Sequence, residues 1–384
     1  MSALRDYTYL GLTQSLCPKC LRLVQAKIAV REGRVFFLKT CPQHGKIEDF
    51  VCSDVNYYDR QEFSRPSRKP LFYATEAQKG CPYDCGLCPE HEQHTCIGLA
   101  EITTACNLEC PMCYAVSGPG GVHWSYETYT EVVDRFVRAE GSPDVLQLSG
   151  GEPTIHPEFL RMVKYAYSKP VQVLMVNSNG IRLANDQRLV DGLAEFRDRL
   201  EIYLQFDGFE KKTWETLRGE SLLDVKMRAL DNLAARGIRS TLVCTVQHGL
   251  NMHEMGAIVK LGMEREWVRG VSFQPATYSG RHINPADLHN RATMPDVVKG
   301  IVAQTGGWLR EDDFMPLPCA HPNCHMMCFI WRGAGGPLPV GRLVDIKKNL
   351  DLVANTIVYT PHKAKNVVAE FLKREAACCA PGES

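Results

Sequence analysis

The sequence lacks an excess of charge of either sign, because 44 Lys and Arg residues balance 44 Asp and Glu residues. A net charge of zero gives no reason to expect a nucleic acid or an anionic membrane as a partner. The sequence also lacks a run of about 18 apolar residues, the length that a membrane-spanning helix needs. Residues 1–7 do not resemble the charged start of a secretory signal. We therefore expect a cytoplasmic protein without a transmembrane segment, whose contact with a membrane is at most peripheral.

Cysteine, in contrast, is abundant, with 17 residues in a chain of 384. The cysteines fall into groups spaced Cys-x2-Cys and Cys-x3-Cys, which is typical of metal ligation in a reducing compartment rather than of disulfides. The length suffices for two or three domains and appendages. We expect a metal module in residues 1–60, a linker with an auxiliary cluster in 61–96, a barrel in 97–280 and a cluster-binding extension in 281–384.

The central motif is Cys106-x3-Cys110-x2-Cys113, followed directly by Tyr114. Three thiolates at this spacing can hold three irons of a [4Fe-4S] cube and leave the fourth iron open for chemistry. A structural zinc knuckle or a ferredoxin-type relay would usually need a fourth nearby cysteine, and none follows Cys113 until Cys244. Cys244 lies within an apolar run, where we expect a small buried side chain.

A second metal site is expected near the N-terminus, where two ligand pairs flank a hairpin. Alternating residues in 26–31 and 34–39 around a glycine turn predict two antiparallel strands. Ligand pairs at both ends of a hairpin are typical of a zinc ribbon or a rubredoxin knuckle, and the spacing fits zinc and iron equally. The expected ligands are Cys17, Cys20, Cys41 and His44, with Cys52 as the alternative to His44.

Two further cysteine groups predict auxiliary clusters. Cys81, Cys85 and Cys88 repeat the spacing of the central motif, but no strand-like run precedes them and Cys96 offers a fourth thiolate. We assign these four to an auxiliary [4Fe-4S] cluster, with zinc as the alternative. Close to the C-terminus the chain offers a third set, for which the fourth ligand is left open among Cys378, Cys379, a histidine and substrate: Cys319, Cys324 and Cys328.

Strand-like and helix-like segments alternate from residue 97 onward, and the repeat stops beyond Arg281. Alternation of this kind predicts an α/β fold with a parallel sheet and right-handed crossovers. Six units make a partial (β/α)6 barrel of the TIM type, with its chemistry in the loops after the strands. The expected strands are 97–102, 144–148, 171–176, 200–206, 239–246 and 268–273, and the expected helices are 126–139, 158–167, 187–196, 222–235 and 252–263.

Polar and glycine residues follow the predicted strands, at the rim where the central motif also lies. Glycines at a strand end allow a close backbone approach to a ligand. Asn251 and Gln274 are rim candidates that could equally serve loop packing. The remaining candidates are Gly150, Gly151, Glu152 and Pro153 after the second strand, Asn179 after the third, and Gln205 and Asp207 at the fourth.

The cysteine triplet, followed one strand–helix unit later by Gly-Gly-Glu-Pro, resembles the radical SAM superfamily. The order of all the cysteine groups resembles its tetraether lipid synthase-like group, once classed as methyltransferase-like. The resemblance implies a [4Fe-4S] cluster that binds S-adenosylmethionine (SAM), with the SAM amino group at residues 150–153 and further SAM contacts at Asn179 and Asp207. Gln205 departs from the Ser that this branch often has. The resemblance also implies auxiliary clusters and a mononuclear iron or zinc.

A member of this superfamily would cleave SAM reductively to a 5′-deoxyadenosyl radical, which abstracts hydrogen from substrate. The group implies C–C bond formation on lipid alkyl chains, with a peptide-modifying or methyl-transferring enzyme as the alternative. A small-molecule or lipid substrate and an electron donor such as ferredoxin or flavodoxin are the expected partners, without nucleic acid. The hypothesis from a different functional class is a non-catalytic iron–sulfur electron carrier, which would not bind SAM.

Overall fold

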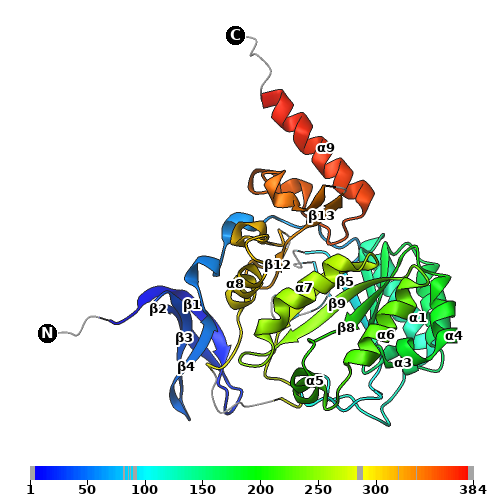
Figure 1. Cartoon of the computed structure of the whole chain (residues 1–384). Coiled ribbons are helices and arrows are strands. Elements are labelled where there is room, and N and C mark those ends of the chain that lie inside the picture. Colours follow the sequence, from blue (N-terminus) through cyan, green and yellow to red (C-terminus); the bar gives the residue numbers. More distant parts are fainter. Residues whose placement is uncertain are drawn as a thin grey trace.

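The computed structural model describes residues 5–80, 83–84, 86, 88–89, 93–282, 289–318, 320–333 and 335–378. Its body is a six-stranded sheet whose strands lie side by side in sequence order, each parallel to the next (Figure 1). All six predicted strands are present, so the predicted partial barrel is confirmed. The strands are β5 (Ile97–Thr103), β6 (Val145–Gly150), β7 (Val173–Ser178), β8 (Leu200–Gln205), β9 (Arg239–Val246) and β10 (Val268–Pro275).

The five predicted helices are present as α1 (Tyr126–Glu140), α2 (Phe159–Tyr167), α4 (Gln187–Ala194), α6 (Leu223–Ala234) and α7 (Met255–Glu264). Two short helices, α3 (Ile181–Asn185) and α5 (Lys211–Arg218), were not predicted. The prediction that the strand–helix repeat stops at Arg281 was wrong, because α8 (Met294–Gln304) follows β10 and packs on α7. The signal for α8 was local: Thr293 and Asp296 form a capping box at its start.

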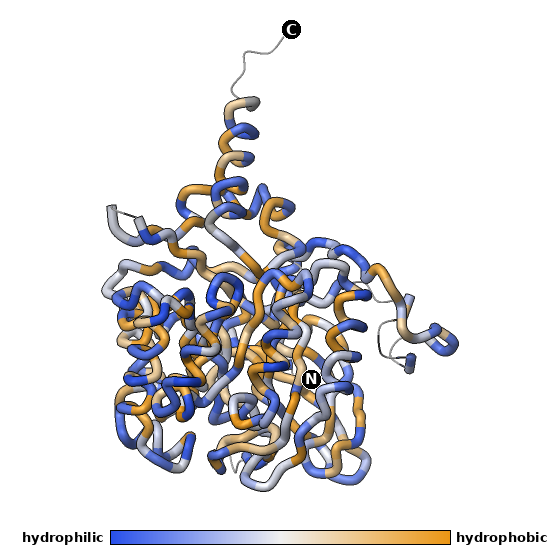
Figure 2. Tube along the Cα trace, turned by 90° about the vertical axis from the view of Figure 1, so that its right-hand side faces the viewer, coloured by the Kyte–Doolittle hydropathy of each residue, from blue (hydrophilic) through white to orange (hydrophobic). Residues whose placement is uncertain are grey.

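The two faces of the sheet differ sharply in polarity. Along β8, Ile202 and Leu204 are fully buried in the core that the helices cover. Glu201, Tyr203 and Gln205 alternate with them and are only half-buried, because successive side chains of a strand point to opposite faces. Figure 2 shows hydrophobic and hydrophilic stretches intermixed along the trace of the body. The helix-covered face therefore supplies the core, and the opposite, inner face carries polar side chains.

The N-terminal segment forms a separate antiparallel sheet in the order β1 (Thr8–Leu16), β2 (Leu23–Arg31), β3 (Arg34–Cys41) and β4 (Gly45–Cys52). The predicted hairpin is confirmed as β2 and β3, and one further strand flanks it on each side. This sheet contacts the body near the start of α8. The Ser53 backbone N–H donates to Thr293 Oγ1 at 3.2 Å, and Lys299 pairs with Asp54 at 2.5 Å.

The segment after α8 forms two short strand pairs, β11 (Met315–Pro316) with β12 (Met326–Met327) and β13 (Ile330–Gly333) with β14 (Gly336–Pro339). The helix α9 (Pro361–Cys378) then extends away from the body (Figure 1).

This segment contacts the end of the sheet where the parallel strands begin. The Ile357 backbone N–H donates to Asp144 just before β6, and Arg332 donates to the carbonyl of Val268 at the start of β10. The C-terminal segment thus lies at the end of the barrel opposite to the central cysteine motif. In the described residues, no helix combines the length and the apolar character needed to cross a membrane.

Candidate functional site

The loop after β5 carries Cys106, Cys110 and Cys113 and is held by its own backbone. The Cys106 N–H donates to the Gly118 carbonyl at 2.9 Å, and the Cys113 N–H donates to the Cys110 carbonyl at 3.2 Å. Cys106 is buried, and Cys110 and Cys113 are half-buried. Burial raises the pKa of the Cys106 thiol to about 11. A thiolate in this position therefore needs a positive partner such as iron.

An apolar floor supports this loop, because Leu108, Trp214 and Leu222 cluster with Cys106. Arg281 holds the loop from the other side. Its guanidinium donates to the Cys110 carbonyl at 3.1 Å and to the Ser117 carbonyl at 2.6 Å. Sequence reasoning missed Arg281, because an arginine in a loop is ordinarily read as a solvated charge.

The Gly-Gly-Glu-Pro loop sits directly on the cysteine loop. The Gly151 N–H donates to the Thr103 carbonyl at 2.7 Å, and the Glu152 N–H donates to the Ala105 carbonyl at 2.9 Å. A Cβ at Gly150 or at Gly151 would lie 2.1 Å from one of these carbonyl oxygens. Both glycines are thus required for contact between two backbone segments, whereas we expected them to approach a ligand. Pro153 then begins a short 3-10 turn.

Glu152 is fully buried and its carboxylate is bonded by the protein itself. It accepts hydrogen bonds from Thr154, from the Ser178 hydroxyl at 2.9 Å and from the Asn179 N–H at 2.6 Å. Burial raises the pKa of Glu152, although these hydrogen bonds oppose the shift. The carboxylate thereby fixes the end of β7 against the loop after β6.

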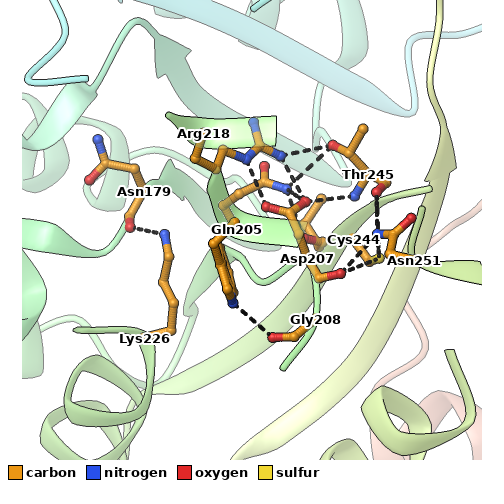
Figure 3. Close-up of polar contacts among 11 residues, drawn as sticks. Asn179, Gln205, Asp207, Gly208, Arg218, Lys226, Cys244, Thr245 and Asn251 are labelled. Carbon is orange, nitrogen blue, oxygen red and sulfur yellow. Dashed lines mark hydrogen bonds and ion pairs between the residues drawn. The ribbon is translucent and has the colours of Figure 1, made fainter. Parts of the chain in front are cut away.

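Asn179 connects that strand end to the cysteine loop. Its Nδ2 donates to Asn107 Oδ1 at 2.7 Å and lies 3.9 Å from Cys106 Sγ. The carbonyl of Asn179 accepts a hydrogen bond from Lys226 Nζ on α6 (Figure 3). Lys226 is fully buried, and burial lowers its pKa to about 8, with Arg218 contributing to the fall. Lys226 was not predicted, because lysine on an amphipathic helix usually faces water.

Asp207 and Arg218 form a buried ion pair beside the cysteine loop (Figure 3). Arg218 donates to both carboxylate oxygens at 2.7 and 2.8 Å, and Gln205 Nε2 and the Thr245 N–H add bonds at 2.8 and 2.9 Å. Burial alone would lower the pKa of Arg218, but Asp207 and then Cys110 raise it. Arg218 therefore keeps a positive charge next to a predicted cluster ligand.

Asn251 serves the backbone around this ion pair. Its Nδ2 donates to the carbonyls of Asp207 and Thr245 at 2.9 and 2.8 Å, and its Oδ1 accepts from the Gln247 N–H at 2.9 Å. Its contact with a cofactor stays a prediction, and the geometry favours a positioning role.

Cys244 is fully buried, as expected. Tyr114 is 58% exposed and lies near Glu101 and Ser149.

The N-terminal sheet gathers the four predicted metal ligands, Cys17, Cys20, Cys41 and His44, with one ligand atom of each within 4.8 Å of the others. His44 Nδ1 lies 3.4 Å from Cys17 Sγ and 3.6 Å from Cys41 Sγ. The alternative ligand, Cys52, instead bonds the Asp54 carbonyl at 3.3 Å. The geometry therefore favours His44 over Cys52, and its role as a metal ligand stays a prediction.

The thiol of Cys41 shows how this site favours a metal. Burial raises its pKa, but hydrogen bonds from the backbone of Gln43 and the ring of His44 outweigh this effect and lower the pKa to about 6. The thiolate that a metal requires is thus already favoured near neutral pH. Leu21 directly follows the Cys17/Cys20 pair, and Gly45 directly follows the Cys41/His44 pair. Their positive φ angles of 57° and 73° let the backbone turn back after each ligand pair.

Cys81, Cys85 and Cys319 lie outside the described residues, so both auxiliary clusters stay predictions. Cys88 is buried and Cys96 is half-buried at the start of β5, while the central motif follows the other end of that strand. A seven-residue strand spans about 23 Å, and this length separates Cys96 from the start of the loop that carries the central motif. His94 Nε2 lies 3.5 Å from Cys96 Sγ, and Glu140 orients the ring at 3.3 Å; sequence reasoning missed this histidine. Towards the C-terminus, Cys324 is exposed and Cys328 half-buried.

Two family models match the chain: "HMPTM N-terminal zinc ribbon domain" over residues 9–53 and "Radical SAM superfamily" over residues 100–262. The chain is 31% identical over 372 residues to 7,8-dihydro-6-hydroxymethylpterin dimethyltransferase of Methanocaldococcus jannaschii, covering 90% of this chain and 73% of that protein. The chain therefore belongs to the radical SAM superfamily, in its methyltransferase-like group with an N-terminal zinc ribbon, and is an enzyme that uses a [4Fe-4S] cluster and SAM.

Other relatives match a smaller part of the chain. Mycofactocin maturase MftC of Mycobacterium tuberculosis is 30% identical over 164 residues, which is 42% of this chain and 40% of that protein. GTP 3′,8-cyclase of Chlorobaculum tepidum is 25% identical over 177 residues, which is 45% of this chain and 52% of that protein. Among solved structures, Streptococcus suis SuiB bound to its precursor peptide SuiA gives a TM-score of 0.45 at 12% identity, covering 56% of this chain and 48% of that chain.

Replacing His44 tests the assignment of the fourth ligand in the N-terminal sheet. We expect His44→Ala to lose the metal of this site, because three remaining ligands cannot close a tetrahedral structural site. Elemental analysis for zinc and iron on the purified chain measures the loss. Cys52→Ala is the matched control and should retain the metal; loss from Cys52→Ala with retention in His44→Ala would reverse the assignment.

Replacing Gly151 tests the contact between the two loops. Gly151→Ala would place a methyl group 2.1 Å from the Ala105 carbonyl oxygen, so the cysteine loop must move and the three thiols separate. We expect the variant to hold less than half of the iron at this loop after anaerobic reconstitution. Gly341→Ala is the control, since its Cβ would make only an ordinary contact of 3.8 Å. Unchanged iron and sulfide content in Gly151→Ala would show that the glycine is dispensable.

Proposed function

We propose that this protein is a radical SAM methyltransferase that acts on a ring carbon, or on a carbon attached to the ring, of a pterin-like bicyclic heterocycle. The observation that carries the proposal is the similarity to the pterin dimethyltransferase across 90% of this chain, including the zinc ribbon as well as the barrel. The partial relatives, in contrast, match 42% and 45% of this chain.

In this proposal Cys106, Cys110 and Cys113 hold the cluster with the open iron. Bound there, the cluster supplies the electron that cleaves SAM and so initiates hydrogen abstraction from the substrate. Arg281 and the Gly150–Gly151 backbone keep the three thiols together. The predicted SAM contacts divide by burial: Tyr114, Asn179 and Gln205 keep partly exposed side chains at the rim, while Glu152, Asp207 and Asn251 are fully buried. The buried three act by positioning their neighbours.

The inner face of the sheet supports a polar substrate. Most of its side chains carry hydrogen-bonding groups, some of them already paired with one another, as Asn177 is with Ser149 and Thr241 with Glu201. An alkyl chain bound there would offer no hydrogen bond to the groups that remain, at a cost of about 1–3 kcal/mol for each group left buried without a partner. We therefore favour methyl transfer to a heterocycle over the joining of lipid alkyl chains. The polar residues of this face are Glu101, Gln147, Ser149, Asn177, Glu201, Tyr203, Gln205, Thr241, Thr245, Ser272 and Gln274.

The source of electrons belongs to the same proposal. A one-electron donor of the ferredoxin or flavodoxin type fits the requirement for reductive cleavage. The cytoplasmic location and the absence of a nucleic-acid partner stay predictions from composition.

The test is an anaerobic reaction of the reconstituted protein with dithionite, SAM and 7,8-dihydro-6-hydroxymethylpterin. We expect 5′-deoxyadenosine together with a methylated pterin, both resolved by mass spectrometry, and methyl-labelled SAM shows whether SAM is the methyl source. Cys113→Ala should lower 5′-deoxyadenosine formation at least a hundredfold, because the cluster loses an iron ligand. Cys52→Ala should retain it. A reaction that neither methylates the pterin nor transfers deuterium from a deuterated pterin into 5′-deoxyadenosine would overturn the proposed substrate. Methylation that fails while deuterium is transferred would show that the methyl group comes from a donor other than SAM. Full activity in Cys113→Ala would overturn the proposed site.

A further inference from the structure

A chain of hydrogen bonds crosses the inner face of the sheet between β8 and β10. Gln274 Nε2 donates to the Tyr203 hydroxyl at 3.1 Å, and the Tyr203 hydroxyl donates to Ser272 Oγ at 2.7 Å. Tyr203 reaches across the intervening strand β9, since β8 and β10 are not neighbours. None of the predicted SAM contacts is among these three residues. Sequence analysis singled out only Gln274 among them.

The direction of these hydrogen bonds determines which donor and acceptor groups of Ser272 and Gln274 remain for a ligand. The single hydroxyl proton of Tyr203 is used on Ser272, so the Ser272 oxygen acts as an acceptor and its own proton is available. Within the described residues the structure gives this proton no acceptor, and it gives Gln274 Oε1 no donor. One strand thus presents an O–H donor and a C=O acceptor two residues apart, on the same face of the sheet.

The position of this pair places it beside the proposed reaction centre. In the register of β9 and β10, Ser272 lies opposite Val243 and Gln274 lies opposite Thr245. Thr245 Oγ1 in turn accepts a hydrogen bond from Arg218 at 2.9 Å, and Arg218 lies next to Cys110. The pair therefore lies one strand from the residues that support the cysteine loop, at the same end of the sheet.

We propose that Ser272 and Gln274 bind the lactam edge, –NH–C(=O)–, of the substrate, and that Tyr203 positions them. The Ser272 hydroxyl donates to the lactam oxygen, and Gln274 Oε1 accepts from the lactam N–H. This inference rests on the proposed function, because the pyrimidinone ring of a pterin carries such an edge. The site recognises one edge of the ring system and leaves the distal ring free to face the cysteine loop.

The experiment measures the dissociation constant of 7,8-dihydro-6-hydroxymethylpterin by fluorescence for the reconstituted wild-type protein, Tyr203→Phe and Ser272→Ala. We expect Ser272→Ala to bind about tenfold more weakly, the effect of losing one hydrogen bond to the ligand. Tyr203→Phe should also bind more weakly, because Ser272 and Gln274 lose the hydroxyl that positions them. The KM for the pterin should rise accordingly while kcat changes less. Tyr165→Phe is the matched control, since its hydroxyl bonds Asp134 at 2.8 Å on the outer helices, and it should bind as the wild type does. SAM cleavage in the absence of pterin reports that each variant is folded.

A second ligand separates recognition from general structural damage. An analogue that lacks the 4-oxo group cannot accept the Ser272 hydrogen bond, so Ser272→Ala should bind it as well as the wild type does. Equal weakening for pterin and analogue in both variants would overturn the lactam site, as would unchanged pterin binding in both. If the wild-type protein itself neither binds nor methylates the pterin, the proposed function fails and this site fails with it. If the wild type methylates the pterin and the variants bind it normally, only this site fails.

Discussion

The contact between two backbone segments, Gly150–Glu152 and Thr103–Ala105, is the constraint on which the site depends. The N–H groups of Gly151 and Glu152 donate to the carbonyls of Thr103 and Ala105 at 2.7 and 2.9 Å, and no side chain fits between the two segments. The loop after β5 and the loop after β6 consequently form one rigid unit. The three cysteines are positioned by this unit, since the loop that carries them contains no helix or strand of its own within residues 104–125.

Around this unit the structure places buried charge of defined sign. Glu152 lies on one side, and Arg218 with its partner Asp207 lies on the other, while Lys226 binds the Asn179 carbonyl between them. Each of these groups is removed from water, so each needs a partner within the protein. The partners are backbone and side-chain groups of the four strand ends β6 to β9. Catalytic geometry and the stability of the strand ends are thus supplied by the same hydrogen bonds.

Local sequence predicted the parts of this site that local chemistry determines. Cysteine spacing predicted the central motif and the four candidate ligands that lie together in the N-terminal sheet, and the alternation of strands and helices predicted the barrel. Arg281 and Lys226 were not predictable in this way, because their roles arise from contacts with residues 47 to 171 positions away in the chain. The inner polar face likewise depends on which side of each strand the helices cover, and Tyr203 gains its role only when β10 lies two strands away. The α8 helix was missed because residues 276–293 separate it from β10.

The central claim is that the cluster held by Cys106, Cys110 and Cys113 keeps one iron open for SAM. Electron–nuclear double resonance on the reduced, reconstituted protein tests it directly, with SAM labelled by ¹⁵N at the amino group and by ¹⁷O at the carboxylate. We expect hyperfine coupling from both labels, which shows that the amino acid end of SAM binds an iron of this cluster. A cluster signal unchanged by SAM and without coupling to either label would contradict the account.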